Sequence, residues 1–381
     1  MTLGIDASNL RDGGGITHLV ELLKVAEPDK FNFTKVIIWS GKRTLDKIEE
    51  QEWLTKCYLP KLDKNLIFRM FWQRFELSKL ARKAGCAVLF APGGSYAGNF
   101  HPVVTMSRNL LPFEWNELLR YGFSIKLFKM ILLRITQTYT FRNADGLIFL
   151  TEYAKNVVNK IAKIPEHKTV IIPHGINSRF IIKPKTQYHI ENYTIENPFR
   201  LIYVSVIEMY KHQWNVAEAV IELRKKGIPV TLDLIGSAYA PALKKLKAKL
   251  AVIDPFNKVV NYLKAVSHFE IRSKYAQSDL FIFASSCENM PNILLEAMAS
   301  GLPIACSNMG PMPEVLEDGG VYFNPLEVSD IIVAIKKLID SNTLRLLLAD
   351  KAFGKAQFFS WKICANDTFN FLAEIADKNR K

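Results

Sequence analysis

The stretch LFIFASSCENMPNILLEAMASGLPIACS, residues 280 to 307, contains in succession an apolar strand, a polar loop, a helix and a second apolar strand. Such a strand–helix–strand unit predicts a parallel sheet covered by helices. Pro291 is suited to the first helical position, because its missing N–H costs nothing there. The backbone amides of Asn292 and Ile293 would then point out of the helix N-terminus, where unpaired donors and a partial positive charge favour a bound diphosphate.

Similar apolar runs, rich in β-branched residues, alternate with helical patterns along the whole chain. They fall in two sets, separated by a polar, strand-poor stretch from about Asn177 to Asn197. The first set occupies residues 36–40, 87–92, 103–106, 146–151 and 170–173, and the second 201–205, 230–236, 259–263, 280–285 and 302–307. We therefore predict an α/β protein with two Rossmann-like, doubly wound domains facing each other across a cleft, in residues 1–185 and 198–355. Residues 356–381 are expected to form a C-terminal helix that packs back toward the first domain.

The charge distribution and the cysteines limit which partners and which compartment we expect. The net charge of +13 lies almost entirely in residues 1–190, which hold 28 Lys and Arg against 16 Asp and Glu, whereas residues 191–381 hold 22 against 21. No nucleic-acid recognition motif accompanies this basic half, so nucleic acid is not an expected partner. The five cysteines are widely spaced without a C-x-x-C pair, and the N-terminus lacks the pattern of a secretory signal. These features predict reduced thiols in a cytoplasmic protein.

Within residues 280–307, Glu288 lies in the predicted loop and Glu296 in the predicted helix. Their spacing does not require them to share a face. The string ENMPNILLE resembles the E-x7-E signature of retaining glycosyltransferase family 4, which has the GT-B fold. The resemblance continues through EAMASGLPI and PEVLEDGGVYFNP, is specific over residues 201–325, and is looser over the N-terminal half. It implies that Glu288 contacts hydroxyl groups of a donor sugar and that Glu296 holds the nucleotide ribose.

The segment YVSVIEMYKHQWNVAEAV, residues 203–220, resembles the strand, loop and helix that carry an arginine and a lysine for the donor phosphates in that family. Lys211 matches the lysine, a cation that offsets charge on a departing diphosphate. Val206 stands where the arginine is usual. We further expect Ser205 to line the donor site, with Tyr262 and Leu263 near the base and ribose.

The acceptor side is less well defined. A predicted strand, LGIDAS (residues 3–8), leads to Gly13, Gly14 and Gly15. These glycines precede a helix that contains His18, and they resemble the family's glycine loop beside the acceptor and phosphate. Arg108 lies where many relatives carry a histidine, so no general base is assigned. It is either a second cation for the phosphates or a structural arginine. His174, in a segment resembling the family's hinge, is interpreted as structural, and the other histidines are expected to stand alone in the core or on the surface.

These features together predict a transferase that moves a sugar from a nucleotide-linked donor to a glycan or lipid-linked acceptor. The resemblance implies a UDP- or GDP-linked donor and retention of anomeric configuration. Its expected process is the synthesis of cell-envelope polysaccharide or lipopolysaccharide. No metal-ligand spacing and no D-x-D pair are present, so we expect neither a metal nor a cofactor. The alternatives are a glycoside hydrolase, which has no use for a diphosphate site, a nucleotide-sugar epimerase of the same fold, and a catalytically silent protein that binds sugar nucleotide or lipid.

Two basic segments of the first half, residues 66–85 and 116–135, have apolar side chains at helical spacing with a basic rim. Helices of this kind lie in the interface of anionic membranes. They also occur as ordinary core helices with solvated charges. Both interpretations stay open, and the first predicts peripheral contact of the N-terminal domain with the inner face of the cytoplasmic membrane.

Overall fold

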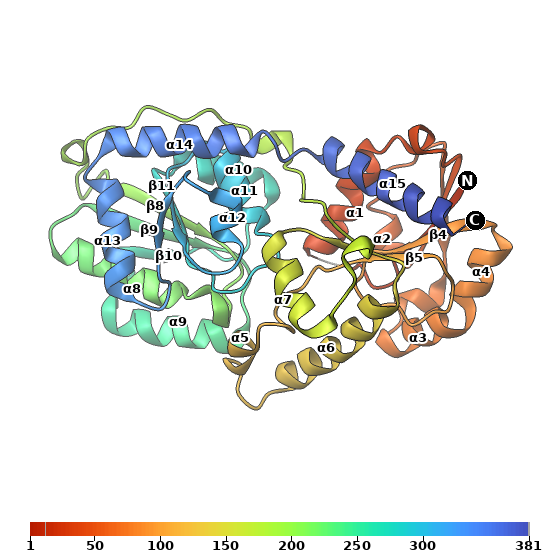
Figure 1. The fold of residues 1–381 in the computed structure, drawn as a ribbon. Coiled ribbons are helices and arrows are strands. Elements are labelled where there is room, and N and C mark those ends of the chain that lie inside the picture. The colour runs from red at the N-terminus through yellow and green to blue at the C-terminus, as the bar shows by residue number, and fades with distance from the viewer. Residues whose placement is uncertain (12, 380–381) are drawn as a thin grey trace. The chain divides into compact units, whose positions relative to one another are not determined.

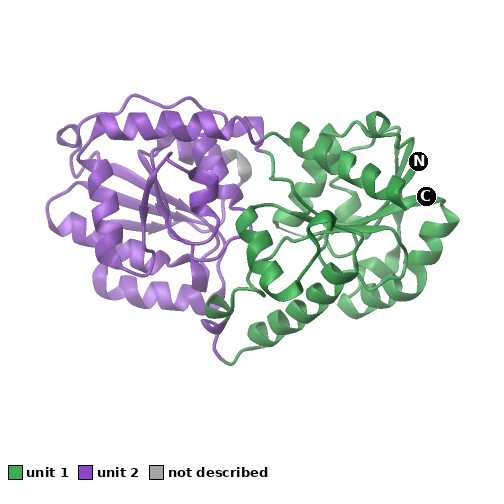
Figure 2. Cartoon of the chain, viewed as in Figure 1, with its two compact units in different colours: residues 1–118, 123–175, 360–381 green, residues 119–122, 176–359 purple. Residues whose placement is uncertain are grey.

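The computed structural model describes residues 1–11 and 13–379, which divide into two compact units. Unit 1 comprises residues 1–118, 123–175 and 360–381, and unit 2 comprises residues 119–122 and 176–359 (Figure 2). Each unit has its own parallel sheet with helices around it (Figure 1). The predicted domain boundaries, after residues 185 and 355, stay predictions.

The sheet of unit 1 has seven strands in the order β3-β2-β1-β4-β5-β6-β7, and all of its pairings are parallel. The strands are β1 (Thr2–Asp6), β2 (Lys35–Ser40), β3 (Leu54–Tyr58), β4 (Cys86–Ala91), β5 (Val103–Met106), β6 (Gly146–Phe149) and β7 (Thr169–Ile171). The helices from this part of the chain are α1 (Gly14–Val25), α2 (Lys42–Leu45), α3 (Leu66–Trp72), α4 (Ser78–Lys83), α5 (Trp115–Leu119), α6 (Ile125–Asn143) and α7 (Glu152–Ala162), together with α15 (Trp361–Lys378) from the C-terminus.

The sheet of unit 2 has six parallel strands in the order β10-β9-β8-β11-β12-β13. They are β8 (Phe199–Val204), β9 (Val230–Ile235), β10 (Val260–Tyr262), β11 (Leu280–Phe283), β12 (Ile304–Ser307) and β13 (Val321–Phe323). The helices are α8 (Gln213–Lys225), α9 (Ala240–Ile253), α10 (His268–Gln277), α11 (Asn292–Ala299), α12 (Met312–Leu316), α13 (Val328–Ile339) and α14 (Asn342–Ala356). The prediction of two doubly wound α/β domains is confirmed.

The central strands are buried along their whole length, as expected where helices cover both faces of a parallel sheet. Every residue of β5, β6, β11 and β12 is buried. The sequence did not predict β3 and β13, which are edge strands. β3 mixes polar and half-buried residues, and β13 has only three residues, so neither contains a long apolar run.

Helix α15 packs against α1 and β4 within unit 1. Trp361, Phe369 and Leu372 are buried in this contact. A side chain at Gly175 would meet the backbone nitrogen of Trp361 at 2.1 Å, so only glycine permits the close approach of the two segments.

The prediction of one helix over residues 116–135 is wrong. The chain ends α5 at Leu119 and begins α6 at Ile125, with Gly122 at a φ of +54° between them. The hydroxyl of Ser124 accepts a hydrogen bond from the Leu127 amide and so caps the new helix. Residues 66–83, in contrast, are helical throughout, with a π-helical turn at Gln73–Leu77. Among the described residues, none of the helices has the length and apolar character needed to traverse a bilayer.

Candidate active site

The loops that follow β8 and β11 lie where the strand order of unit 2 reverses. These strands are neighbours, but the chain passes from β8 to β9 on one side and from β11 to β12 on the other. In doubly wound sheets, ligands bind outside the carboxyl ends of the strands at such a point. The loops are joined there, since the Ser286 amide donates to the Tyr210 carbonyl at 2.8 Å and His212 Nε2 lies 2.8 Å from Ser286 Oγ.

Lys211 and Glu288, one from each loop, form an ion pair in which Lys211 Nζ donates to Glu288 Oε1. Only 6% of the lysine side chain and 15% of the glutamate side chain are exposed. Lys211 Nζ also lies 4.8 Å from the centre of the Phe283 ring, and its carbonyl accepts a 2.6 Å hydrogen bond from the Tyr203 hydroxyl. The structure thus brings together the two residues that the sequence assigned to the donor phosphate and the donor sugar, and holds both in a mostly buried position.

Helix α11 begins beside this pair, one residue later than predicted. Pro291 precedes the helix instead of forming its first residue, because its carbonyl is the first acceptor of the helical hydrogen bonds, from Leu294 at 2.9 Å and Leu295 at 3.2 Å. Asn292 and Ile293 are therefore the first two helical residues, and their amides have no intrahelical acceptor. These two amide donors therefore lie at the N-terminus of α11.

Two of the predicted donor residues carry buried oxygen atoms without a hydrogen-bond partner among the described residues. These atoms are Ser205 Oγ, at the end of β8, and Asn292 Oδ1, at the start of α11. A buried polar atom left unpaired costs about 1–3 kcal/mol. Such atoms are expected where a polar ligand completes the hydrogen bonding.

Glu296 lies one turn inside α11, where Glu296 Oε2 accepts a 3.3 Å hydrogen bond from the Tyr275 hydroxyl. Burial raises the pKa of Glu296 to about 7, although this hydrogen bond and the charge of Arg179 act in the opposite direction. The sequence did not predict Tyr275 or Arg179 as neighbours of this carboxylate. Neither stands in a motif, so only the fold identifies them.

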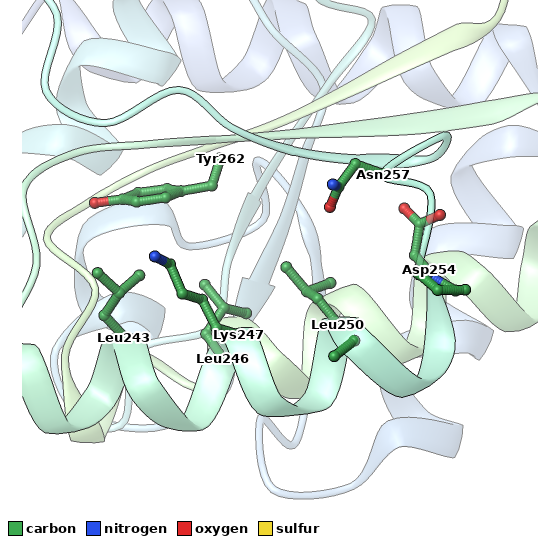
Figure 3. A pocket seen from close by; sticks show the side chains of 9 residues that line it. Leu243, Leu246, Lys247, Leu250, Asp254, Asn257 and Tyr262 are labelled. Carbon is green, nitrogen blue, oxygen red and sulfur yellow. The ribbon is translucent and has the colours of Figure 1, made fainter.

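Tyr262 is the last residue of the edge strand β10, and Leu263 follows it. The Tyr262 hydroxyl donates to the Gly236 carbonyl at 3.0 Å, and the Leu263 amide donates to the Leu234 carbonyl at 2.9 Å. The ring of Tyr262 lies over a pocket of about 320 Å³ along α9, whose labelled lining residues are shown in Figure 3. Among the described residues that line this pocket, Tyr262 is the only predicted donor residue.

In unit 1, Arg108 contacts the glycine loop. Arg108 Nη2 donates to the Gly14 carbonyl at 2.6 Å, and Nη1 donates to the Gly15 carbonyl at 3.2 Å. Burial lowers the pKa of the Arg108 guanidinium to about 10. Gly13, at a φ of +70°, is the N-cap of α1. Three predicted acceptor-side elements, the loop, the start of α1 and Arg108, therefore form one cluster.

His18 does not stand alone, contrary to expectation. His18 Nδ1 lies 2.7 Å from His174 Nδ1 in the buried interior of unit 1, and the Trp361 ring contacts both imidazoles. Burial and, secondarily, the charge of Arg108 lower the pKa of His174 to about 3, and the pKa of His18 is lowered as well. One neutral ring then donates to the other, as the short separation requires.

The described residues contain no group of three or more His, Cys, Asp or Glu side chains that could hold a metal ion. Metal-independent chemistry stays a prediction. The roles assigned to individual site residues likewise stay predictions.

Parts of the sequence are similar to those of known glycosyltransferases. Residues 184–354 match the model of the family described as "Glycosyl transferases group 1". The O-antigen chain mannosyltransferase B of Escherichia coli is 31% identical over 230 residues, which are 60% of each protein. The chain thus spans about 60% of the length of this curated relative.

Solved structures share the fold over the whole chain. Sucrose-phosphate synthase from Thermosynechococcus elongatus matches with a TM-score of 0.75 at 16% identity, covering 97% of both chains. Anabaena Alr3699/HepE, solved in complex with UDP-glucose, matches with a TM-score of 0.69 at 16% identity, covering 100% of this chain and 99% of that one. Residues 184–354 thus match the glycosyl transferases group 1 family, and the chain has the predicted GT-B fold.

Proposed function

We propose that the protein is a retaining glycosyltransferase that moves a sugar from a UDP- or GDP-linked donor to a glycan or lipid-linked acceptor. The observation that carries the proposal is the buried Lys211–Glu288 ion pair at the strand-order reversal of unit 2. A cation, a carboxylate and the free amides of α11 are the groups that a diphosphate joined to a polyhydroxylated sugar requires.

The names of the relatives support this assignment. One is named an O-antigen chain mannosyltransferase, and another was solved in complex with UDP-glucose. Both names are consistent with a nucleotide-sugar donor. The first favours a place for this chain in cell-envelope polysaccharide or lipopolysaccharide synthesis.

In the proposed complex, the donor diphosphate lies against Lys211 and the amides of Asn292 and Ile293. Glu288 turns from Lys211 to accept hydrogen bonds from sugar hydroxyls, and Glu296 accepts those of the ribose. The bond between the anomeric carbon and the diphosphate oxygen breaks, and its electron pair leaves with the diphosphate. The acceptor hydroxyl oxygen bonds to the same face of that carbon, while its proton passes to the departing phosphate oxygen. The site's main contribution is to stabilise the charge that develops on the diphosphate.

Unit 1 supplies the acceptor side in this proposal, through Gly13 to Gly15 and Arg108. No metal or cofactor takes part. The excess of basic residues in the first half favours a cytoplasmic enzyme that contacts an anionic membrane peripherally.

A panel of UDP- and GDP-sugars tests the proposal, because a ligand that binds the folded state raises its apparent melting temperature. We expect one donor to stabilise the wild-type protein and to release nucleoside diphosphate when acceptor glycans or lipid-linked sugars are added. Release of an altered nucleotide sugar without an acceptor would instead identify an epimerase. Binding without turnover would identify a silent binder, and cleavage of free oligosaccharides a hydrolase. No response to any nucleotide sugar would contradict the proposal.

A further inference from the structure

Helix α6 presents its apolar stripe to solvent. Five large side chains recur three or four residues apart on one face, and each is 60–75% exposed: Ile125, Phe128, Leu132, Ile135 and Tyr139. Phe123, just before the helix, is fully exposed. The face buried against unit 1 holds Leu127, Gln137, Thr140 and Phe141. The exposed face is therefore more apolar than the buried one, the reverse of an ordinary surface helix.

The helical run of residues 66–77 also exposes large apolar side chains. Six large apolar side chains are 44–62% exposed: Leu66, Ile67, Phe68, Met70, Phe71 and Phe75. The rings of Phe71 and Phe75 stack on each other at 5.9 Å. Trp72, Gln73 and Leu77 are the side chains of this run that are buried.

The helices that carry the two exposed faces belong to unit 1 and are both hydrogen-bonded to one loop, residues 96–99. The Tyr96 amide donates to Thr140 Oγ1 in α6 at 3.0 Å, and the Asn99 amide donates to Ser78 Oγ at the start of α4, also at 3.0 Å. In Figure 1, α3 and α6 both lie along the lower edge of unit 1. Together the two faces expose twelve large apolar side chains, far more than the isolated exposed residues usual on a soluble monomer.

Basic residues surround these apolar faces. Residues 64–83 contain six Lys and Arg and a single acid, Glu76, which is paired with Lys61. Arg69 is the exception among these basic residues, since it turns inward and donates to Ser8 and Asn9. Residues 123–143 contain four Lys and Arg and no acid. Arg142 donates to the Ile161 and Ala162 carbonyls at the end of α7, and Arg134 lies over the Trp115 ring. Lys126 and Lys129 are therefore the basic residues of this segment that we assign to the basic rim. Lys64 Nζ lies 4.7 Å from the centre of the Phe68 ring, so charge and apolar surface are adjacent. A second copy of the chain would bring the same positive charges against this surface, which disfavours self-association and favours an anionic partner.

We propose that the exposed faces of residues 66–77 and 123–139 form one docking surface for the interface of an anionic bilayer. The apolar side chains enter the boundary between head groups and acyl chains, while the surrounding Lys and Arg meet lipid phosphates. A bilayer fits both requirements at once, since it offers negative charge above an apolar layer. The inference rests on the proposed function only in that a membrane would present a lipid-linked acceptor; the docking itself does not require transfer.

Vesicle binding of the full chain, without nucleotide sugar, tests the docking surface. We compare phosphatidylcholine vesicles with vesicles containing about one third phosphatidylglycerol, and expect binding to the anionic vesicles that weakens in high salt. The triple variant Phe128→Ser/Leu132→Ser/Ile135→Ser should bind at least about tenfold more weakly. The control Val252→Ser/Phe256→Ser/Val333→Ser removes side chains of unit 2 that are 64–79% exposed, and should bind as the wild type does. Both variants alter exposed positions, so their melting temperatures should stay close to that of the wild type.

A Phe128→Trp variant reports the depth of insertion. Brominated acyl chains should quench the new indole, whereas a Val333→Trp control should remain unquenched. Absence of binding to anionic vesicles, or equal binding by the α6 variant and the unit 2 control, would overturn the proposal. Two other results would also overturn it. One is a wild-type dimer that the α6 triple variant disrupts and the unit 2 control leaves intact, and the other is binding of an acidic protein in place of the vesicles. Glu288→Gln should bind vesicles normally, which separates this test from failure of the proposed transferase activity.

Discussion

Replacing Lys211 with Met and Glu288 with Gln, singly and together, tests whether the buried ion pair is the centre of the site. Both side chains are mostly buried, and each charge has the other as its direct ion-pair partner. Each single variant leaves one buried charge without its ion-pair partner. The double variant leaves none.

The expected magnitudes follow from this burial. Two charges about 3 Å apart in a medium of effective dielectric near 20 attract by about 5 kcal/mol, much of which the desolvation of the charges offsets. Removing one partner of a buried pair costs about 3–5 kcal/mol, whereas removing both is often close to neutral. For a unit the size of unit 2, each kcal/mol shifts the melting temperature by about 2–4 °C. We therefore expect each single variant to melt roughly 6–20 °C lower and the double variant to recover most of that loss.

Calorimetry of the four proteins measures the coupling, and donor turnover measures function. All three variants should lose sugar transfer, including the double variant that regains stability, because none retains both the cation and the carboxylate. Single variants as stable as the wild type, or costs that simply add in the double variant, would refute the buried-pair reasoning. Near-wild-type transfer by any of the three would refute the assignment of the site.

Other predictions concern neighbouring residues. Burial raises the pKa of Glu296 to about 7, so the folded protein still holds a proton that the unfolded chain releases near pH 4.5. The free energy of unfolding should therefore fall as pH rises between these values, by roughly 3 kcal/mol at pH 8. Glu296→Gln should abolish this slope in urea unfolding measured from pH 5 to 8. His174, with a pKa lowered to about 3, contributes stability that is lost as pH falls below about 6.5, so His174→Met should flatten the acid limb of the melting profile. A side chain at Gly236, at a φ of +152°, would lie 2.1 Å from the Ser205 carbonyl oxygen, so Gly236→Ala should destabilise the protein by at least about 2 kcal/mol. Gly354→Ala, on an exposed turn of α14 with no atom near its added carbon, should instead stabilise it by about 0.5–1 kcal/mol; equal effects at the two glycines would contradict the steric argument.

The fold was largely predictable because its strands are buried on both faces and therefore form continuous apolar runs. The missed strands β3 and β13 lie at the sheet edges, where one side of the strand is unpaired and burial is partial. The break between α5 and α6 escaped prediction for a different reason. Apolar spacing across residues 119–131 fits one helix, and the positive φ of Gly122 that interrupts it leaves no trace in that spacing.

The site was predictable where a local motif carried it. Lys211 and Glu288 came from separate motifs, and the sheet topology brought them into contact. The neighbours that act through space were not predictable. His18 and His174 are 156 residues apart, and Tyr275 is 21 residues from Glu296, so no spacing rule connects them. The orientation of α6 was equally inaccessible, because its apolar stripe predicts an amphipathic helix but not which way the stripe faces.

Three unfavourable features meet at the carboxyl edge of the unit 2 sheet. Ser205 and Asn292 hold buried oxygen atoms without partners among the described residues, Glu296 is a carboxylate whose ionisation burial opposes, and Lys211 and Glu288 are desolvated charges. Each lowers stability relative to an apolar packing of the same loops. A bound nucleotide sugar would relieve all three. Its hydroxyl groups would donate to the two carboxylates and to the asparagine oxygen, and its phosphate oxygens would accept from the lysine and from the serine hydroxyl. The features that folding alone disfavours are therefore the ones that a nucleotide-sugar site requires, and donor binding should stabilise unit 2 more strongly than unit 1.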